Sequence, residues 1–303
     1  MPSITANGLT FEYEDEGPRD GPVLLLIIGL AAQLVFWPKA VLDGFHAAGF
    51  RTIRFDNRDI GKSEKLEARP APHPVKSLML ARLGHKAFAP YLLSDMADDA
   101  HGLLAALDIP RAHVLGVSMG GIIGQILAAE RPETVASLTA VMSTTNHPKL
   151  PAAAPEITKA LARPANGPLT EDEQVDRSLA FWRLIATEES VNSDGLRERI
   201  RASVQRGAYE PGVRRQMAAI LATGDVRGWT RQIKAPTLAI HGIEDRFVWP
   251  EAGLDIARNA PDSRFELING MAHDLPESRT GRIVDLVVDH MRQADDQAAP
   301  KAA

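Results

Sequence analysis

One serine of this chain stands where a tight backbone turn would expose its hydroxyl group. Gly116 and Gly120 lie two residues on either side of Ser118, and the apolar run 111–115 precedes them. Small residues at these two positions let the chain turn sharply from a strand into a helix, which presents the serine at the end of the strand. The pattern Gly-x-Ser-x-Gly alone also fits an ordinary glycine-rich loop. Here apolar residues at helical spacing follow over 119–129, and this context favours a catalytic serine.

A serine nucleophile needs a general base and a group that orients the base. His273 lies in a loop directly after the predicted strand 264–268, and Asp245 lies in the corresponding loop after the predicted strand 237–241. Taken singly, an aspartate in such a loop is more often a turn former, and a loop histidine is more often a solvated or capping residue. Because both follow strands in a chain order known for serine hydrolases, we predict the triad Ser118, Asp245 and His273.

Two neighbouring residues are alternatives for these roles. Glu244 adjoins the predicted acid, but adjacent loop residues point in different directions, so we expect one of the two to face the base. His241 ends the preceding strand, and we interpret it as a packing or hydrogen-bonding residue rather than the base.

Acyl transfer also requires donors for the oxyanion that forms on the carbonyl oxygen. The backbone N–H of Met119, directly after the serine, is the first candidate. The second is the N–H of Leu30, because the apolar run 23–28 has the length of a strand and ends at Gly29. A simple helix-entry loop is the other interpretation of this segment.

These residues need a frame that brings strand ends together. After a hairpin-like start over 3–14, strands and helices alternate along most of the chain. This alternation predicts an α/β protein with a mostly parallel, doubly wound sheet and an active site at the carboxyl ends of the strands.

The alternation is interrupted in the second half of the chain. We predict a core domain of residues 1–145 and 230–294, a helical cap of about three or four helices over 146–229, and a disordered tail over 295–303. In the cap, a capping box at 170–173 predicts the start of one helix, and Gly207 and Gly224 predict the ends of two others.

An inserted cap would form a wall of the substrate pocket and exclude water from it. The residues that we predict to contact substrate are Gln33, Trp37, Trp182, Met217 and Phe247. For the cap aromatics and methionine the alternative is packing within the cap, and Trp37 also fits a plug at the base of a helix.

With these features placed, the chain resembles the α/β-hydrolase family from about Leu9 to Met291. Residues 55–63, Phe-Asp-Asn-Arg-Asp-Ile-Gly-Lys-Ser, resemble the family segment Asp-x-Arg-Gly-x-Gly-x-Ser, with Asp59 in place of the usual glycine. Many members have His-Gly where this chain has Ile28 and glycine, a departure that removes a side chain which often braces the oxyanion loop. The family pattern also favours Asp245 over its neighbour as the acid.

Segments 55–63, 113–120 and 270–273 together are similar to the anthracycline (aclacinomycin) methylesterase-like branch of that family. The resemblance implies a serine esterase that acts through an acyl-enzyme on a bulky polyketide-type ester or lactone, without a cofactor or metal. A carbon–carbon bond hydrolase or a cofactor-free perhydrolase would use the same triad. A ligand-binding receptor of this fold is a further alternative. Haloalkane dehalogenases and epoxide hydrolases are disfavoured, since they resemble this fold but carry aspartate at the position of Ser118.

Composition fits a catalytic domain with a modest insertion. The 303 residues are 45% hydrophobic, carry a net charge of −5 and include no cysteine. They therefore predict no nucleic-acid partner, no disulfide and no thiolate nucleophile. The N-terminal residues lack a basic segment followed by an apolar one, and no apolar run reaches the ~20 residues of a membrane span. We expect a cytoplasmic protein without a membrane partner, either a monomer or a weak homodimer.

Overall fold

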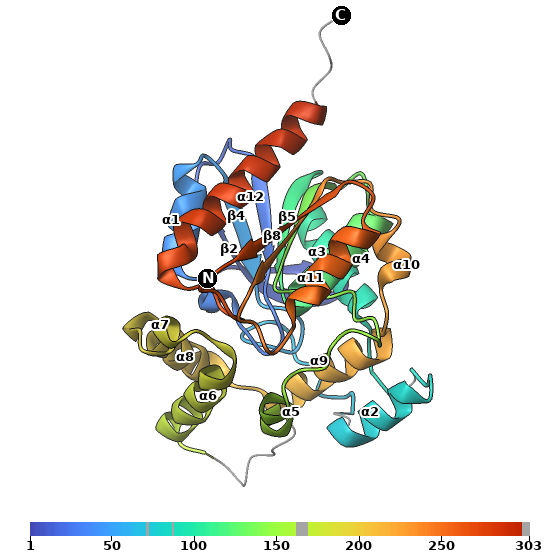
Figure 1. The fold of residues 1–303 in the computed structure, drawn as a ribbon, viewed down its shortest axis with the longest axis vertical. Coiled ribbons are helices and arrows are strands. Elements are labelled where there is room, and N and C mark those ends of the chain that lie inside the picture. Colours follow the sequence, from blue (N-terminus) through green and yellow to red (C-terminus); the bar gives the residue numbers. More distant parts are fainter. Residues whose placement is uncertain (71–72, 87, 162–168, 299–303) are drawn as a thin grey trace, which may run out of the picture.

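A mostly parallel sheet forms the centre of the molecule (Figure 1). The computed structural model describes residues 1–303 except 71–72, 87, 162–168 and 299–303. Within these residues the eight strands are β1 (Ser3–Ala6), β2 (Leu9–Glu16), β3 (Val23–Ile27), β4 (Arg51–Phe55), β5 (Ala112–Val117), β6 (Val135–Val141), β7 (Thr237–Gly242) and β8 (Ser263–Ile268). Their order across the sheet is β1-β2-β4-β3-β5-β6-β7-β8, with β1 and β2 antiparallel and the strands from β4 onward parallel. The predicted fold class is confirmed.

Helices cover both faces of this sheet and form a separate group beyond one end of it. The helices of the described residues are η1 (Leu34–Phe36), α1 (Lys39–Ala47), α2 (Pro74–Arg82), α3 (Leu93–Ala106), α4 (Met119–Glu130), α5 (Pro155–Leu161), α6 (Glu171–Ile185), α7 (Glu188–Val191), α8 (Asp194–Gly207), α9 (Glu210–Thr223), α10 (Arg227–Thr230), α11 (Pro250–Asn259) and α12 (Glu277–Ala298). Among the described stretches, no helix is both long enough and apolar enough to cross a membrane.

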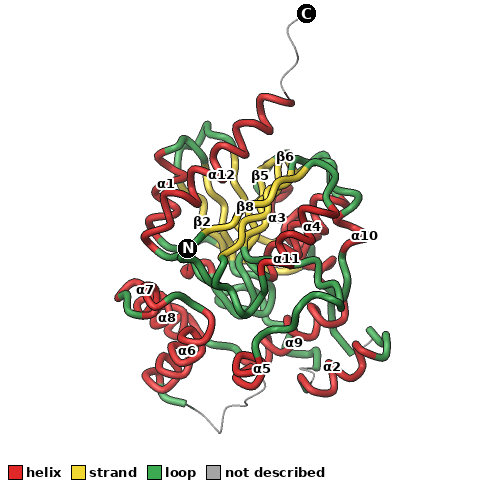
Figure 2. Tube along the Cα trace, in the orientation of Figure 1, coloured by secondary structure: helices red, strands yellow, loops and turns green. Residues whose placement is uncertain are grey.

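Side chains of the inner strands point alternately into two helical layers. In β3, Leu24 and Leu26 pack with α1 and α12, whereas Leu25 and Ile27 pack with α3 and α4. None of the four is more than 1% exposed. Because helices cover both faces, as Figure 2 shows, the inner strand β3 is a continuous apolar run in the sequence.

The segment between β6 and β7 forms the cap helices below the sheet in Figure 1. Within the described residues it carries α5 to α10 and no strand. Thr170 and Glu173 form the predicted capping box at the start of α6, and α8 and α9 end at the predicted glycines. The prediction of three or four helices located α6, α8 and α9; it did not locate α5, of seven residues, or α7 and α10, of four residues each, which are too short to show an apolar period. Helix α10 packs against α4 and α11, so the last cap residues contact the core layer.

The C-terminal helix continues into the segment predicted as a disordered tail. Residues 295–298 belong to α12, which corrects that part of the prediction, while 299–303 lie outside the described residues. The Oδ2 atom of Asp295 lies 3.3 Å from Nε2 of His113, a buried residue of β5. This contact with the core favours a helix that is longer than the composition of the segment indicates.

A buried histidine on α12 makes the stability of the fold sensitive to acid. His290 is 4% exposed, and its Nε2 lies 3.2 Å from the carbonyl oxygens of Leu138 and Pro236. Burial, and after it the positive charge of Arg264, lowers the pKa of His290 from 6.5 to about 4. The unfolded chain therefore takes up this proton first, so the contribution of neutral His290 to stability is complete above pH 6.5 and declines as the pH falls toward 4.

We expect the His290→Gln variant to lose less stability on acidification than the unsubstituted protein. Between pH 7.5 and 5.0 the free energy of unfolding should fall by about 2 kcal/mol more in the unsubstituted protein, because of the displaced pKa. Urea unfolding at the two pH values measures this difference. The exposed His85→Gln variant is the control and should behave like the unsubstituted protein. Equal losses in all three proteins would contradict the prediction.

Candidate active site

The predicted nucleophile sits on a strained turn between β5 and α4. Ser118 has φ 54° and ψ −119°, a conformation that L-residues rarely adopt. The turn needs glycine on both sides: a Cβ on Gly116 would lie 2.2 Å from the carbonyl oxygen of Gly120, and a Cβ on Gly120 would lie 2.0 Å from that of Ile27. This geometry places the half-buried Ser118 hydroxyl at the carboxyl end of the sheet.

The structure brings the three predicted triad residues together in a chain of hydrogen bonds. Ser118 Oγ lies 3.1 Å from His273 Nε2, and His273 Nδ1 lies 2.7 Å from Asp245 Oδ2. The three residues follow β5, β7 and β8; β7 and β8 are neighbours in the sheet, and β6 alone separates β5 from β7. This geometry is the one that proton transfer from the serine to the histidine requires.

The carboxylate of Asp245 is fully buried and held by several donors. Oδ1 accepts hydrogen bonds of 2.9 Å from the N–H groups of Phe247 and Val248. Burial raises the pKa of Asp245, but the charge of His273 and the hydrogen bonds from His241 and His273 outweigh it and lower the pKa to about 2. The carboxylate is therefore ionised at neutral pH, and it can hold the proton on Nδ1 of His273 while Nε2 stays free to accept one.

The two alternative residues have other contacts. Glu244 is exposed, and its Oε1 accepts a hydrogen bond from the N–H of Gly270. His241 is fully buried, and its Nε2 lies 2.7 Å from the carbonyl oxygen of Val248 and 3.4 Å from Oδ2 of Asp245. His241 thus lies near the same carboxylate oxygen of Asp245 that contacts the predicted base.

Two backbone N–H groups are available for an oxyanion. Met119 is the first residue of α4, so its N–H belongs to the helix's first four, for which no carbonyl within the helix is available. After β3, Gly29 lies against the serine, since a Cβ on it would be 3.2 Å from the Cβ of Ser118. Leu30 follows directly. Met119 is thus adjacent to Ser118 in the sequence, and Leu30 is adjacent to Gly29, which lies against Ser118. The catalytic role of both N–H groups remains a prediction.

The cap holds the loop of the predicted base through contacts that sequence reasoning missed. The backbone N–H of His273 donates to the carbonyl of Ile185, at the end of α6, at 2.9 Å. The next residue, Asp274, is 5% exposed, and its Oδ2 accepts from the N–H of Thr187 at 3.0 Å and from its hydroxyl at 2.6 Å. Each partner lies about 90 residues away in the sequence, and no local pattern marks such a pair.

Aromatic rings line the cap side of the histidine. The ring centroid of Phe247 lies 4.8 Å from that of His273, and Phe181 of α6 packs edge-on against Phe247 at 6.1 Å. Trp182 stacks on Phe36 at 5.2 Å with an angle of 13° between the rings. Of the predicted substrate contacts, Phe247 is therefore adjacent to the triad, whereas Trp182 packs between the cap and η1.

The remaining predicted contacts differ from one another. Met217 is half-buried on α9. Trp37 is 2% exposed and packs in the core with α1 and α12, so its size reflects core packing rather than a substrate surface. Gln33 is also 2% exposed, and its amide is engaged by α8: Nε2 donates to the carbonyls of Ser203 and Gly207, and Oε1 accepts from Arg206. The bonds of Gln33 and the core packing of Trp37 leave these two side chains almost no exposed surface for a substrate, which corrects both predictions.

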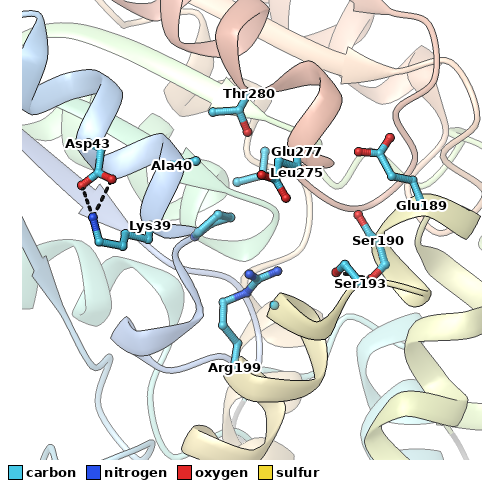
Figure 3. A pocket seen from close by; sticks show the side chains of 12 residues that line it. Lys39, Ala40, Asp43, Glu189, Ser190, Ser193, Arg199, Leu275, Glu277 and Thr280 are labelled. Atoms are coloured by element: carbon cyan, nitrogen blue, oxygen red, sulfur yellow. Dashed lines mark hydrogen bonds and ion pairs between the residues drawn. The ribbon is translucent and has the colours of Figure 1, made fainter.

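A cavity of about 350 Å³ lies between the cap and the core, away from the predicted triad (Figure 3). It is lined by residues of α1, α7, α8 and the start of α12, and the Arg199 side chain points toward it from α8. None of Ser118, Asp245 or His273 lines it. Lys39 and Asp43 on its wall pair with each other, and Glu189 and Glu277 give the cavity a mixed charge. No cluster of side chains suited to hold a metal ion occurs in the part of the chain that the structure describes.

Comparison with known proteins agrees with this architecture. Residues 22–280 match the family model described as alpha/beta hydrolase fold. The rhodomycin D methylesterases DauP of Streptomyces sp. (strain C5) and DnrP of Streptomyces peucetius are 27% and 26% identical to this chain, each over 96% of this chain and 98% of the relative. The solved structure of the enol-lactonase from Burkholderia xenovorans LB400 matches with a TM-score of 0.73 at 23% identity, over 96% of this chain and 100% of that one. At this identity the last likeness shows a common fold.

Proposed function

Since the chain belongs to the alpha/beta hydrolase fold family, we propose that it is a carboxylic ester hydrolase with Ser118 as nucleophile, His273 as base and Asp245 as the acid that orients it. The observation that carries the proposal is the continuous hydrogen-bond chain from Ser118 Oγ through His273 to the buried Asp245 carboxylate. Full-length similarity to two methylesterases supports ester hydrolysis among the reactions open to this triad.

In the first half-reaction, His273 Nε2 takes the proton of Ser118 as the oxygen attacks the ester carbonyl. The N–H groups of Leu30 and Met119 stabilise the negative charge on the carbonyl oxygen. His273 then gives its proton to the departing alcohol, which leaves an acyl group on the serine. The Asp245 carboxylate stabilises the imidazolium that exists between these two transfers.

In the second half-reaction, His273 removes a proton from water, and the water oxygen attacks the acyl carbonyl. Collapse of the second tetrahedral intermediate returns the proton to Ser118 Oγ and releases the acid. The cap contributes by excluding bulk water from this site, which strengthens the electrostatic interactions within it.

For the substrate we propose a bulky ester or lactone of the polyketide type. The rhodomycin D methylesterases, which match over nearly their whole length, support this class. The aromatic ring of Phe247 next to His273, with Phe181 packed against it, gives an apolar wall of the kind that large, flat substrates favour. Met217 on α9, which is half-buried, adds an adaptable side chain to the cap.

Steady-state hydrolysis of a panel of esters tests the proposal. The panel contains p-nitrophenyl esters from acetate to decanoate, methyl esters of polycyclic polyketides and macrolide lactones, with Ser118→Ala as the blank. Serine-dependent turnover with the highest kcat/KM for a bulky ester is the expected result. Turnover restricted to a vinylogous diketone would indicate a carbon–carbon hydrolase, and peracid formation from acetate and peroxide would indicate a perhydrolase. A single covalent turnover without release would indicate a receptor, and each of these three outcomes would overturn the proposal.

A further inference from the structure

The loop that carries the predicted donor Leu30 is a tight turn in an unfavourable conformation. The N–H of Ala32 donates to the carbonyl of Gly29 at 3.3 Å, which closes a four-residue turn. Inside it, Ala31 has φ 63°, in the left-handed region that disfavours residues with a Cβ. Ala31 can keep this unfavourable conformation only because contacts with surrounding residues fix it. The orientation of the Leu30 peptide thus depends on what holds this turn.

A side chain from the cap holds it. The N–H of Ala31 donates to Oε1 of Gln216 on α9 at 3.1 Å, although the two residues are 185 positions apart. The Gln216 amide is 0% exposed, and its Nε2 donates to the carbonyl of Arg58 at 2.9 Å. Both ends of the amide are therefore used, and their orientation is fixed by one N–H donor and one carbonyl acceptor. On the core side, Asn57 Nδ2 holds the carbonyl of Ile28 at 3.1 Å, ahead of the turn.

Helix α9 is itself fixed to the core beside Gln216. Arg215 makes two hydrogen bonds to Asp59, of 2.9 Å and 2.7 Å, and neither residue is more than 1% exposed. The hydroxyl of Tyr91 donates to the same carboxylate at 2.9 Å. Gly212 packs so closely that a Cβ on it would lie 2.1 Å from the carbonyl oxygen of Asp59. Asp59, which replaces the usual glycine of the 55–63 segment, thus anchors α9, the helix that carries Gln216.

We propose that Gln216 is a positioning residue for the oxyanion site, through which the cap sets the orientation of the Leu30 N–H. The inference rests on the proposed function, since it assigns a role within the same catalytic site. It explains how a chain with isoleucine at position 28 keeps its oxyanion loop in place: Gln216 of the cap holds the loop, rather than a side chain at the end of the strand. Loss of the hydrogen bond between Gln216 and Ala31 should weaken transition-state stabilisation while leaving the Ser118–His273 hydrogen bond intact.

The decisive variant is Gln216→Met, which keeps the length of the side chain and removes both hydrogen bonds. Its primary measurement is the second-order rate at which a fluorophosphonate modifies Ser118, followed by mass spectrometry. In this reaction the serine oxygen forms a bond to phosphorus, fluoride leaves, the serine proton passes to His273, and the phosphonyl oxygen occupies the position of the ester oxyanion. We expect the rate to fall about 10- to 50-fold, below the 10²–10³ typical for complete removal of one donor. In ester hydrolysis, kcat should fall by the same factor with KM nearly unchanged.

The matched control is Gln125→Met, since Gln125 is also 0% exposed and its amide makes three hydrogen bonds, to Gly121, Thr144 and Thr230. It should lower the melting temperature to a similar extent and leave the labelling rate within about threefold of the unsubstituted protein. Equal labelling rates in Gln216→Met and Gln125→Met would overturn the inference, as would a rise in KM with unchanged kcat. Labelling at Ser118 without turnover of any ester would defeat the proposed function while still testing this inference.

A second variant, Gln216→Glu, separates positioning from simple packing. A protonated glutamic acid can accept from Ala31 and donate to Arg58 as the amide does, whereas the ionised form has no donor for that carbonyl. Burial favours the neutral form. The labelling rate of Gln216→Glu, divided by that of the unsubstituted protein, should therefore rise as the pH is lowered from 9 to 6, and the ratio for Gln216→Met should stay flat. A flat ratio for both variants would contradict the positioning role.

Discussion

Replacing Ser118 with alanine is expected to lower kcat for ester hydrolysis by about 10⁴-fold or more, because the triad acts as a unit. The Ser118 hydroxyl is the atom that lies 3.1 Å from His273 Nε2, and its removal leaves the other contacts of the histidine in place. Steady-state kinetics on the preferred ester of the panel, with both proteins at equal concentrations determined by absorbance, measures the effect.

The loss should be confined to catalysis. Ser118→Ala keeps the backbone conformation at φ 54°, so its melting temperature should equal that of the unsubstituted protein within error. Ser118→Gly should be inactive yet more stable by about 1 kcal/mol, because glycine relieves the strain of this conformation. If Ser118→Ala retained ester turnover within tenfold of the unsubstituted enzyme, Ser118 would not be the nucleophile.

The sheet was predictable because its signal is local. Strands such as β3 and β7 are short apolar runs, and β3, β7 and the edge strand β8 begin and end within one residue of the predicted limits. Helices with caps and glycine stops, such as α6, α8 and α9, were equally readable. The four-residue helices and the last turns of α12 were missed, because their formation depends on contacts with the core rather than on a periodic pattern of their own.

The candidate site divides in the same way. That Ser118, Asp245 and His273 lie together was predictable, because each follows a strand whose end is visible in the sequence. Gln216 had no such signal: a glutamine on a helix is usually solvated, and its partners come from loops more than 150 residues away. Gln33 was misread for the related reason that a polar residue beside the oxyanion loop suggests substrate binding, whereas its partner is α8. Hydrogen bonds between cap and core are set by tertiary packing, which local patterns do not encode.

Replacing Asp245 with asparagine should lower kcat by about 10⁴-fold through the tautomer of His273 rather than through loss of structure. Two backbone N–H groups, from Phe247 and Val248, point at Oδ1 and require an acceptor there. The amide oxygen of the new side chain must take this position, so its NH₂ group faces Nδ1 of His273. Nδ1 then has to accept, the ring proton moves to Nε2, and Nε2 can no longer receive the proton of Ser118.

The neighbouring carboxylate provides the matched control for this prediction. Glu244→Gln changes the same chemical group one residue away, and kcat should stay within about threefold of the unsubstituted enzyme because Glu244 is exposed and contacts Gly270.

The kcat of Asp245→Asn should stay low from pH 6 to 9, since a changed tautomer is not corrected by pH in this range. The pKa of about 2 keeps Asp245 ionised there, so the acid limb of the unsubstituted enzyme's profile must come from another group. A large loss in Glu244→Gln together with a small one in Asp245→Asn would assign the acid to Glu244 instead, and the hydrogen bond between Asp245 and His273 would then serve structure alone.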